Sequence, residues 1–123
     1  MIEFKEVEKI HDILIEKFGG TKGIRDSGAL ESAINRPYQT FDGQDLYPDT
    51  VDKAAAIFES TISNHPFVDG NKRTAYVLMR LILLENQLDI KTGQDEKFDF
   101  VMKAAKSELS FGQISNWIKE HLE

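Results

Sequence analysis

The chain has 123 residues, of which 41% are hydrophobic and 29% are charged; its formal net charge is −6, and it has no cysteine. This size suits one domain, residues 1–123, and the acidic balance argues against a direct nucleic-acid partner, because non-specific binders use basic surface to displace counterions. Without cysteine the chain has neither disulfides nor thiolate metal sites, which fits a reducing cytoplasm.

The N-terminal segment, Met1–Glu6, lacks the basic and then apolar order of a signal peptide. The longest apolar run, residues 75–84, is interrupted by Arg80 and is shorter than the ~20 residues that a membrane span needs. We therefore expect a cytoplasmic protein that makes no contact with a membrane.

Apolar side chains recur at three- and four-residue steps along most of the chain, which predicts amphipathic helices. Gly19 and Gly20 end the first of them, Asp26 or Ser27 caps the second, and Asp49 or Thr50 caps the third. The predicted helices cover about residues 5–18, 28–35, 50–64, 71–86, 95–106 and 111–122.

The fourth of these helices is apolar on every side in its later turns, so we expect it to be the buried centre of the domain. No stretch shows the sustained alternation of a strand, although residues 37–49 can hold a short hairpin. The fold class that follows is all-α, with about six helices packed around a central buried helix.

Residues 37–49 form a long segment without a helical period, and Tyr38, Phe41 and Tyr47 lie in it. A loop of this length in a small domain is often a lid or a binding loop. The aromatic side chains favour an ordered flap, and the alternative is a hydrophobic plug over the core.

The segment His-Pro-Phe-Val-Asp-Gly-Asn-Lys-Arg-Thr, residues 65–74, concentrates the reactive side chains. A helix that starts near Asn71 presents free backbone N–H groups and the positive end of its dipole, where acidic side chains are stabilising. This helix carries Lys72 and Arg73 there instead. The reversed charge indicates an anion at this end, and Gly70 lets the backbone approach it closely. A polyphosphate fits best.

Asp69 and His65 add chemistry to this phosphate site. A carboxylate beside phosphates is a typical Mg²⁺ ligand, and a histidine can accept a proton from a hydroxyl near neutral pH. Together these groups predict phosphoryl or nucleotidyl transfer to a hydroxyl. Each residue also has a plain structural interpretation: His65 as a helix cap, Asp69 and Asn71 as turn and N-cap residues, and the two cations as solvated surface charges.

Residues 65–74 resemble the signature of the Fic/Doc family, His-x-Phe-x-Asp/Glu-Gly-Asn-Gly/Lys-Arg. Residues 19–37 and the Glu-Leu-Ser at 108–110 also resemble Doc-type toxins, so the resemblance covers nearly the whole chain. Lys72 stands where Fic proteins have glycine and Tyr76 where they have a second arginine, and both differences favour the Doc type. Outside this resemblance, His11 and His121 are predicted to be structural.

The resemblance implies a Fic/Doc-like fold and a toxin kinase that moves the γ-phosphate of ATP to a threonine of elongation factor Tu, which halts translation. It implies that His65 is the general base, that Asp69 holds Mg²⁺, and that Gly70 and Asn71 form the anion nest. Lys72 and Arg73 would hold the phosphates, and the segment with Tyr38, Phe41 and Tyr47 would be a target-positioning flap.

Two alternatives stay open beside this kinase. One is a Fic-type AMP transferase that modifies a protein hydroxyl, and the other is a catalytically weak homologue that mainly binds its antitoxin. In each case the resemblance implies a Phd-like antitoxin as partner, whose tail folds into a helix when it binds the toxin.

Overall fold

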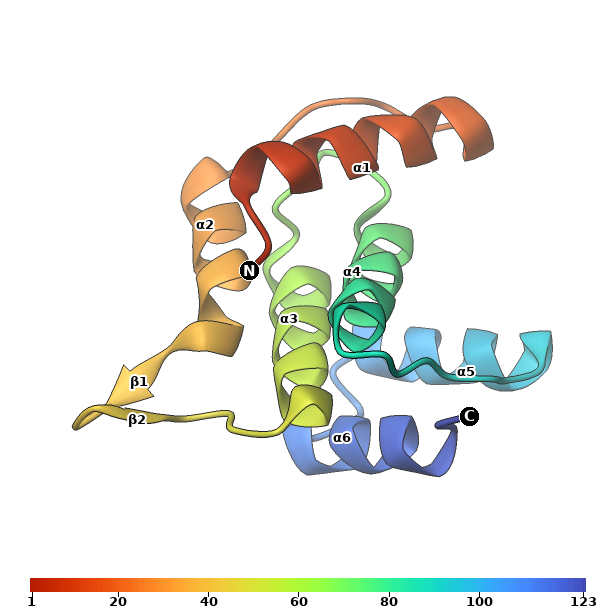
Figure 1. The fold of residues 1–123 in the computed structure, drawn as a ribbon. Helices are drawn as coiled ribbons and strands as arrows, with labels where there is room; N and C mark the ends of the chain where they lie inside the picture. The colour runs from red at the N-terminus through yellow and green to blue at the C-terminus, as the bar shows by residue number, and fades with distance from the viewer.

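The computed structural model describes residues 1–123 and contains six α-helices, one short 3-10 helix and one small hairpin (Figure 1). In chain order they are α1 (Phe4–Phe18), α2 (Ser27–Asn35), η1 (Arg36–Tyr38), β1 (Thr40–Phe41), β2 (Gln44–Asp45), α3 (Thr50–Asn64), α4 (Asn71–Glu85), α5 (Gln94–Ala105) and α6 (Phe111–Glu120). The all-α prediction is confirmed, and the segment at 37–49 does contain a hairpin. None of the helices has the length and apolarity that crossing a bilayer requires.

Local capping chemistry explains where several helices begin and end. The Asp26 side chain accepts a hydrogen bond from the Ala29 amide at the start of α2. Ser110 and Gln113 form a capping box at the start of α6, with both reciprocal bonds present. Gly19 ends α1 with a positive φ of 90°, and its amide donates to the Ile15 carbonyl. The caps at Gly19 and Asp26 bound the segment that joins α1 to α2.

Helix α3 is the centre of the fold, and the prediction that α4 occupies this place is wrong. α3 contacts α2, η1, α4, α5 and α6, whereas α4 contacts α1, α3 and α5. The run Ala54–Ala56 is fully buried, and its small side chains let neighbouring helices approach from several sides. On α4, Arg80 is exposed and Leu84 keeps 51% of its surface in solvent, so one side of that apolar helix remains at the surface.

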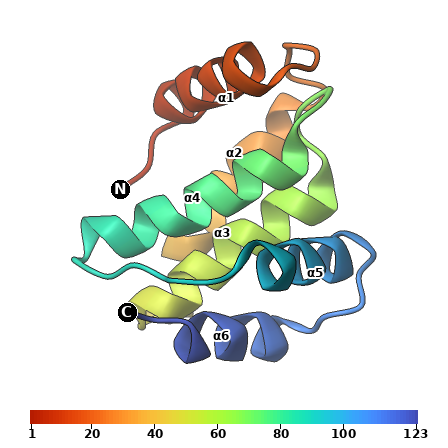
Figure 2. The same cartoon turned by 90° about the vertical axis from the view of Figure 1, so that its right-hand side faces the viewer.

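Helix α1 lies across the ends of α3 and α4, over the loop that joins them (Figure 1). Figure 2 shows the same loop beside the C-terminal end of α1, with α5 and α6 on the opposite side of α3. The motif at 65–74 therefore lies at one end of the α3–α4 pair, under the N-terminal part of the chain.

A row of stacked rings joins α3 to the two C-terminal helices. Phe58 stacks on Phe100 at 4.9 Å between ring centres, Phe100 on Trp117 at 3.9 Å, and Trp117 on His121 at 4.0 Å. The row ends at an ion pair, because His121 Nε2 lies 2.9 Å from a carboxylate oxygen of Glu96. His121 Nδ1 lies 2.7 Å from the Trp117 carbonyl, which supports the structural role predicted for this histidine.

This ion pair should make stability depend on pH. Both partners of the His121 ring are acceptors, so both bonds need the doubly protonated ring, and the Glu96 carboxylate raises the pKa of His121 above its ordinary 6.5. A raised pKa in the folded state stabilises the fold below the unfolded value and stops doing so as the pH rises through the folded value. Urea unfolding of wild type and Glu96→Gln should therefore differ more at about pH 5.5 than at about pH 8.5. An equal difference at both pH values would contradict the assignment.

Candidate active site

His65 is the C-terminal cap of α3 and has a left-handed backbone, with φ 48° and ψ 57°. This conformation costs a non-glycine residue roughly 1–2 kcal/mol, so its surroundings must hold it there. The Arg25 side chain donates from Nε to the His65 carbonyl at 2.6 Å and from Nη2 to the Asn64 carbonyl at 2.8 Å. The imidazole itself is exposed, so it is accessible to a substrate.

Residues 23–26, which we call the strap, run beside the motif. The Arg25 amide donates to the Pro66 carbonyl at 2.8 Å, and the Val68 amide donates to the Gly23 carbonyl at 3.0 Å. Between these bonds, Ile24 and Phe67 pair in an antiparallel bridge. The sequence predicted only a loop here, so the backbone support that the strap gives to the motif was missed.

Phe67 anchors the motif loop in the core. It keeps only 1% of its surface in solvent, and its ring stacks on His11 at 3.8 Å, nearly parallel. His11 Nε2 lies 2.7 Å from the Asp69 carbonyl, which can only accept, so this nitrogen carries the proton. The structural role predicted for His11 is therefore supported, and that role is to support the motif.

Asn71 fastens the same loop from the other side. Its side-chain amide donates to the Phe67 carbonyl and accepts from the Phe67 amide, both at 2.9 Å. The N-cap of α4 is Gly70, with φ 76°, so the interpretation of Asn71 as the N-cap is wrong. Whatever Asn71 offers an anion must come from its backbone amide, because its side chain is already occupied.

The start of α4 has the features of an anion site. The first amide that bonds within the chain is that of Thr74, which donates to Gly70, so the amides of Asn71, Lys72 and Arg73 are free. The first turn has no acidic residue, and the Lys72 and Arg73 side chains are exposed. A substituent at Gly70 would lie 3.1 Å from Cδ1 of Ile15, so the absence of a side chain lets α1 approach the loop.

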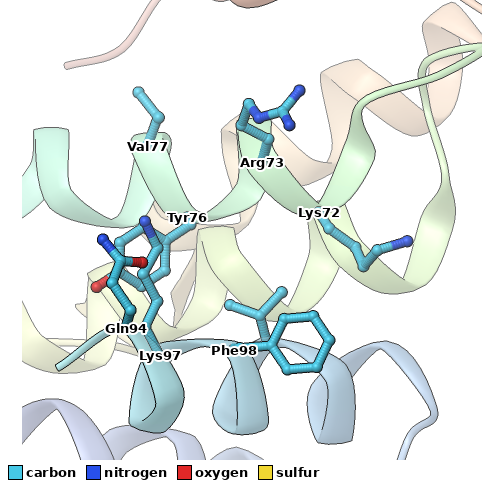
Figure 3. A pocket seen from close by; sticks show the side chains of 8 residues that line it. Lys72, Arg73, Tyr76, Val77, Gln94, Lys97 and Phe98 are labelled. Carbon is cyan, nitrogen blue, oxygen red and sulfur yellow. The ribbon is translucent and has the colours of Figure 1, made fainter. Parts of the chain in front are cut away.

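The two cations extend to different sides of α4. The Arg73 guanidinium lies 4.6 Å from the centre of the Phe18 ring on α1. Figure 3 shows Lys72 on the side that faces α5 and Arg73 pointing away from it. Lys72 borders a cavity of about 210 Å³ between α4 and α5. Its lining residues are Lys72, Arg73, Tyr76, Val77, Gln94, Lys97, Phe98 and Val101. The start of α4 thus borders a groove with aromatic and polar walls.

Asp69, two residues before α4, directs both carboxylate oxygens to backbone amides. One oxygen accepts from the Thr21 amide at 3.1 Å and the other from the Gly70 amide at 2.8 Å. The side chain is exposed, and each oxygen keeps a lone pair for a cation. No group of three acidic, histidine or cysteine side chains gathers in the chain. These residues fit Mg²⁺ held jointly by one carboxylate and by phosphate oxygens, which is the usual mode for this ion.

The structure places the predicted target-positioning flap at the other end of α3 from this site. Tyr38 lies in η1, Phe41 in β1 and Tyr47 just before α3, all near the N-terminal end of α3. His65 follows the other end of this 15-residue helix, so the two regions are about 22 Å apart along its axis. Composition could show that the loop is aromatic, but only the path of α3 shows which end it occupies.

The three aromatics have separate surroundings. The Tyr47 ring packs on Phe111 at 5.3 Å, and its hydroxyl accepts from Arg36 Nε at 3.1 Å. Tyr38 is half-buried, whereas Phe41 keeps 76% of its surface in solvent at the hairpin. The alternative interpretation, a plug over the core, therefore fits Tyr47 and not Phe41.

Comparison with known proteins agrees with this architecture. A model of the Fic/DOC family matches residues 2–83, which is more than half of the chain. The chain belongs to the Fic/Doc family. Its resemblance to Doc-type members is confirmed by Toxin Doc of Mycolicibacterium smegmatis, which is 45% identical over 117 residues. The match covers 94% of this chain and 90% of that protein. Protein kinase doc of Escherichia phage P1 is 28% identical over 115 residues, with the same coverage of both chains.

Gly20 of this Fic/Doc protein makes room for Asp69, and its replacement should displace that carboxylate. A Cβ at Gly20 would lie 2.8 Å from Asp69 Oδ2, and φ is 119°. Gly19 is the matched control, because its φ is 90° and a Cβ there meets nothing within 4 Å. Gly20→Ala and Gly19→Ala should each lose about 1–3 kcal/mol of unfolding free energy in urea. Only Gly20→Ala should shift the NMR signal of the Gly70 amide; a similar shift in both variants would contradict this role.

Proposed function

We propose that this protein is a Doc-type toxin kinase, which transfers the γ-phosphate of ATP to a threonine hydroxyl of elongation factor Tu and so inhibits translation. The observation that carries the proposal is the start of α4, where free amides, Lys72 and Arg73 meet without an acidic residue, next to the exposed His65. The name of the phage P1 relative, a protein kinase, supports the same reaction class.

In this proposal each group of the motif has a role that its position permits. The phosphates of ATP bind the free amides at the start of α4 and the side chains of Lys72 and Arg73. His65 accepts the proton of the target hydroxyl, which then bonds to the γ-phosphorus as the bond to the ADP oxygen breaks. Mg²⁺ held by Asp69 would neutralise charge on the phosphates. Gly70 permits the close backbone approach that the anion needs.

We also propose an antitoxin as the protein's partner, because the relative from M. smegmatis is named as a toxin. Such a partner would be Phd-like, with a tail that becomes helical when it binds. Co-expression with a Phd-like antitoxin should restore growth to cells that the toxin arrests. Continued arrest would count against this partner.

Transfer to elongation factor Tu from ATP labelled at either the α or the γ position distinguishes the reactions. We expect label on the factor only from the γ position. Label only from the α position would replace the kinase with an AMP transferase. Absence of label from either position, with nucleotide bound and His65 intact, would favour a homologue that mainly binds its antitoxin. Mass spectrometry of the labelled factor then identifies the modified residue.

A further inference from the structure

Arg25 is the only residue whose side chain hydrogen-bonds to His65. Its guanidinium spans the last two carbonyls of the α3 end, with Nε at 2.6 Å from the His65 oxygen and Nη2 at 2.8 Å from the Asn64 oxygen. The backbone amide of Arg25 adds a third bond, to the Pro66 carbonyl at 2.8 Å. One residue of the strap thus holds three consecutive carbonyls around His65.

The partial charge at the end of α3 stabilises the Arg25 guanidinium in this position. The C-terminal end of a helix carries partial negative charge and free carbonyls, and a cation there is stabilising. The last turn of α3 has no basic residue of its own. Arg25 forms no ion pair with any acidic residue, so these two carbonyls are the only polar partners of its side chain. The strap therefore supplies the cation that α3 lacks.

The other bonds of the strap do not reach His65 itself. They attach to Pro66 and Val68, on the far side of the histidine from α3. His65, left-handed, lies between the end of α3 and this fixed loop, and Arg25 makes the side-chain hydrogen bond to its backbone carbonyl. Rotation about either backbone torsion of His65 swings the imidazole relative to the start of α4, where the phosphates would bind.

We propose that Arg25 is a positioning residue, which fixes the left-handed backbone of His65 and thereby aims its imidazole at the hydroxyl beside the α4 anion site. This inference rests on the proposed function, because it assumes that His65 is the base. In this proposal Arg25 acts through the backbone of His65 and not through either substrate. Its loss should therefore leave nucleotide binding intact and slow the transfer step, since misplacing a catalytic group by about 1 Å can reduce a rate by about a hundredfold.

Steady-state transfer to elongation factor Tu from γ-labelled ATP tests the proposal. We expect Arg25→Ala to lower kcat by roughly tenfold to a hundredfold, with the KM for ATP changed less than about twofold. Arg25→Lys keeps the positive charge, but its single ammonium group cannot donate to both carbonyls in the geometry of the guanidinium. It should therefore recover only part of kcat. Lys22→Ala is the matched control, because Lys22 is an exposed cation of the same loop that pairs with Glu16 at 2.6 Å. It should transfer at the wild-type rate.

An NMR measurement tests the backbone independently of activity. The Cα chemical shift of His65 reports its left-handed conformation, and we expect it to move toward the extended range in Arg25→Ala but not in Lys22→Ala. An unchanged shift, or an unchanged kcat, would overturn the proposal. Should Arg25→Ala fail to fold, the same two measurements on Arg25→Lys decide the question. If wild type transfers no label, the proposed function fails, while the shift still accepts or rejects the positioning of His65.

Discussion

Replacement of His65 by asparagine should lower phosphate transfer by about a hundredfold to ten-thousandfold, the usual contribution of a general base. Asparagine cannot accept the hydroxyl proton, yet it tolerates the left-handed backbone that His65 adopts at φ 48°. The imidazole is exposed and makes no hydrogen bond within the chain, so little stability should be lost. The measurement is label transfer from γ-labelled ATP, with circular dichroism to follow the helices.

The alanine variant serves as the control for the backbone. His65→Ala removes the same base but adopts the left-handed region less readily, so it should be as inactive and somewhat less stable. Loss of helical signal in both variants would show that His65 is structural, and the transfer data would then say nothing about catalysis. Full activity of the folded asparagine variant would remove His65 from the mechanism.

Replacement of Asp69 by asparagine should lower transfer by at least about a hundredfold, because charge stabilisation at a transferring phosphoryl group is usually worth that much or more. The amide keeps one acceptor for the Thr21 and Gly70 amides but has lost the negative charge that Mg²⁺ needs. The two bonds of the carboxylate close the loop, so we also expect a loss of about 1 kcal/mol of unfolding free energy.

Measurements of nucleotide binding distinguish the proposed Mg²⁺ ligation by Asp69 from its hydrogen bonds to the Thr21 and Gly70 amides. Isothermal titration with ATP should show that Mg²⁺ strengthens binding to wild type and no longer does so in Asp69→Asn. The matched control is Asp42→Asn in the distant hairpin, where φ is 52° and asparagine fits equally well. Equal dependence on Mg²⁺ in all three proteins would assign Asp69 to loop closure alone.

Local sequence patterns predicted the parts of the fold that local physics decides. Asp26 was one of two candidate caps for the second helix, and its side chain makes the cap bond in the structure. The motif was recognisable because Lys72 and Arg73 oppose the helix dipole, a conflict that can be read from neighbours in the chain.

The sequence did not predict that residues 21–26 support the motif, because their contacts are with residues far along the chain. Thr21 bonds to a carboxylate 48 positions away and Arg25 to a carbonyl 40 positions away. Residues 21–25 have no period and no cap pattern, so nothing local distinguishes them from an ordinary loop. Their one signal was glycine, since Gly20 and Gly23 both have positive φ, at 119° and 126°.

The sequence placed α4 at the centre of the domain instead of α3, and this error has a different cause. Apolarity predicted burial of α4, but a large share of any protein surface is apolar, and Leu84 remains half exposed. Alanines at 54–56 made α3 less conspicuous, although small side chains permit the close approach of several neighbours. The centre of a helical domain depends on shape, which hydrophobicity alone does not measure.

The exposed cations at the start of α4 set a limit on how stable this protein can become without losing its site. A sequence optimised only for stability would place aspartate or glutamate at positions 72 and 73, which would gain roughly 0.3–1 kcal/mol at each. Such a variant would melt at a higher temperature and would repel the phosphates. Laboratory evolution that rewards heat resistance alone should therefore erase Lys72 and Arg73 first, whereas selection for toxicity retains them.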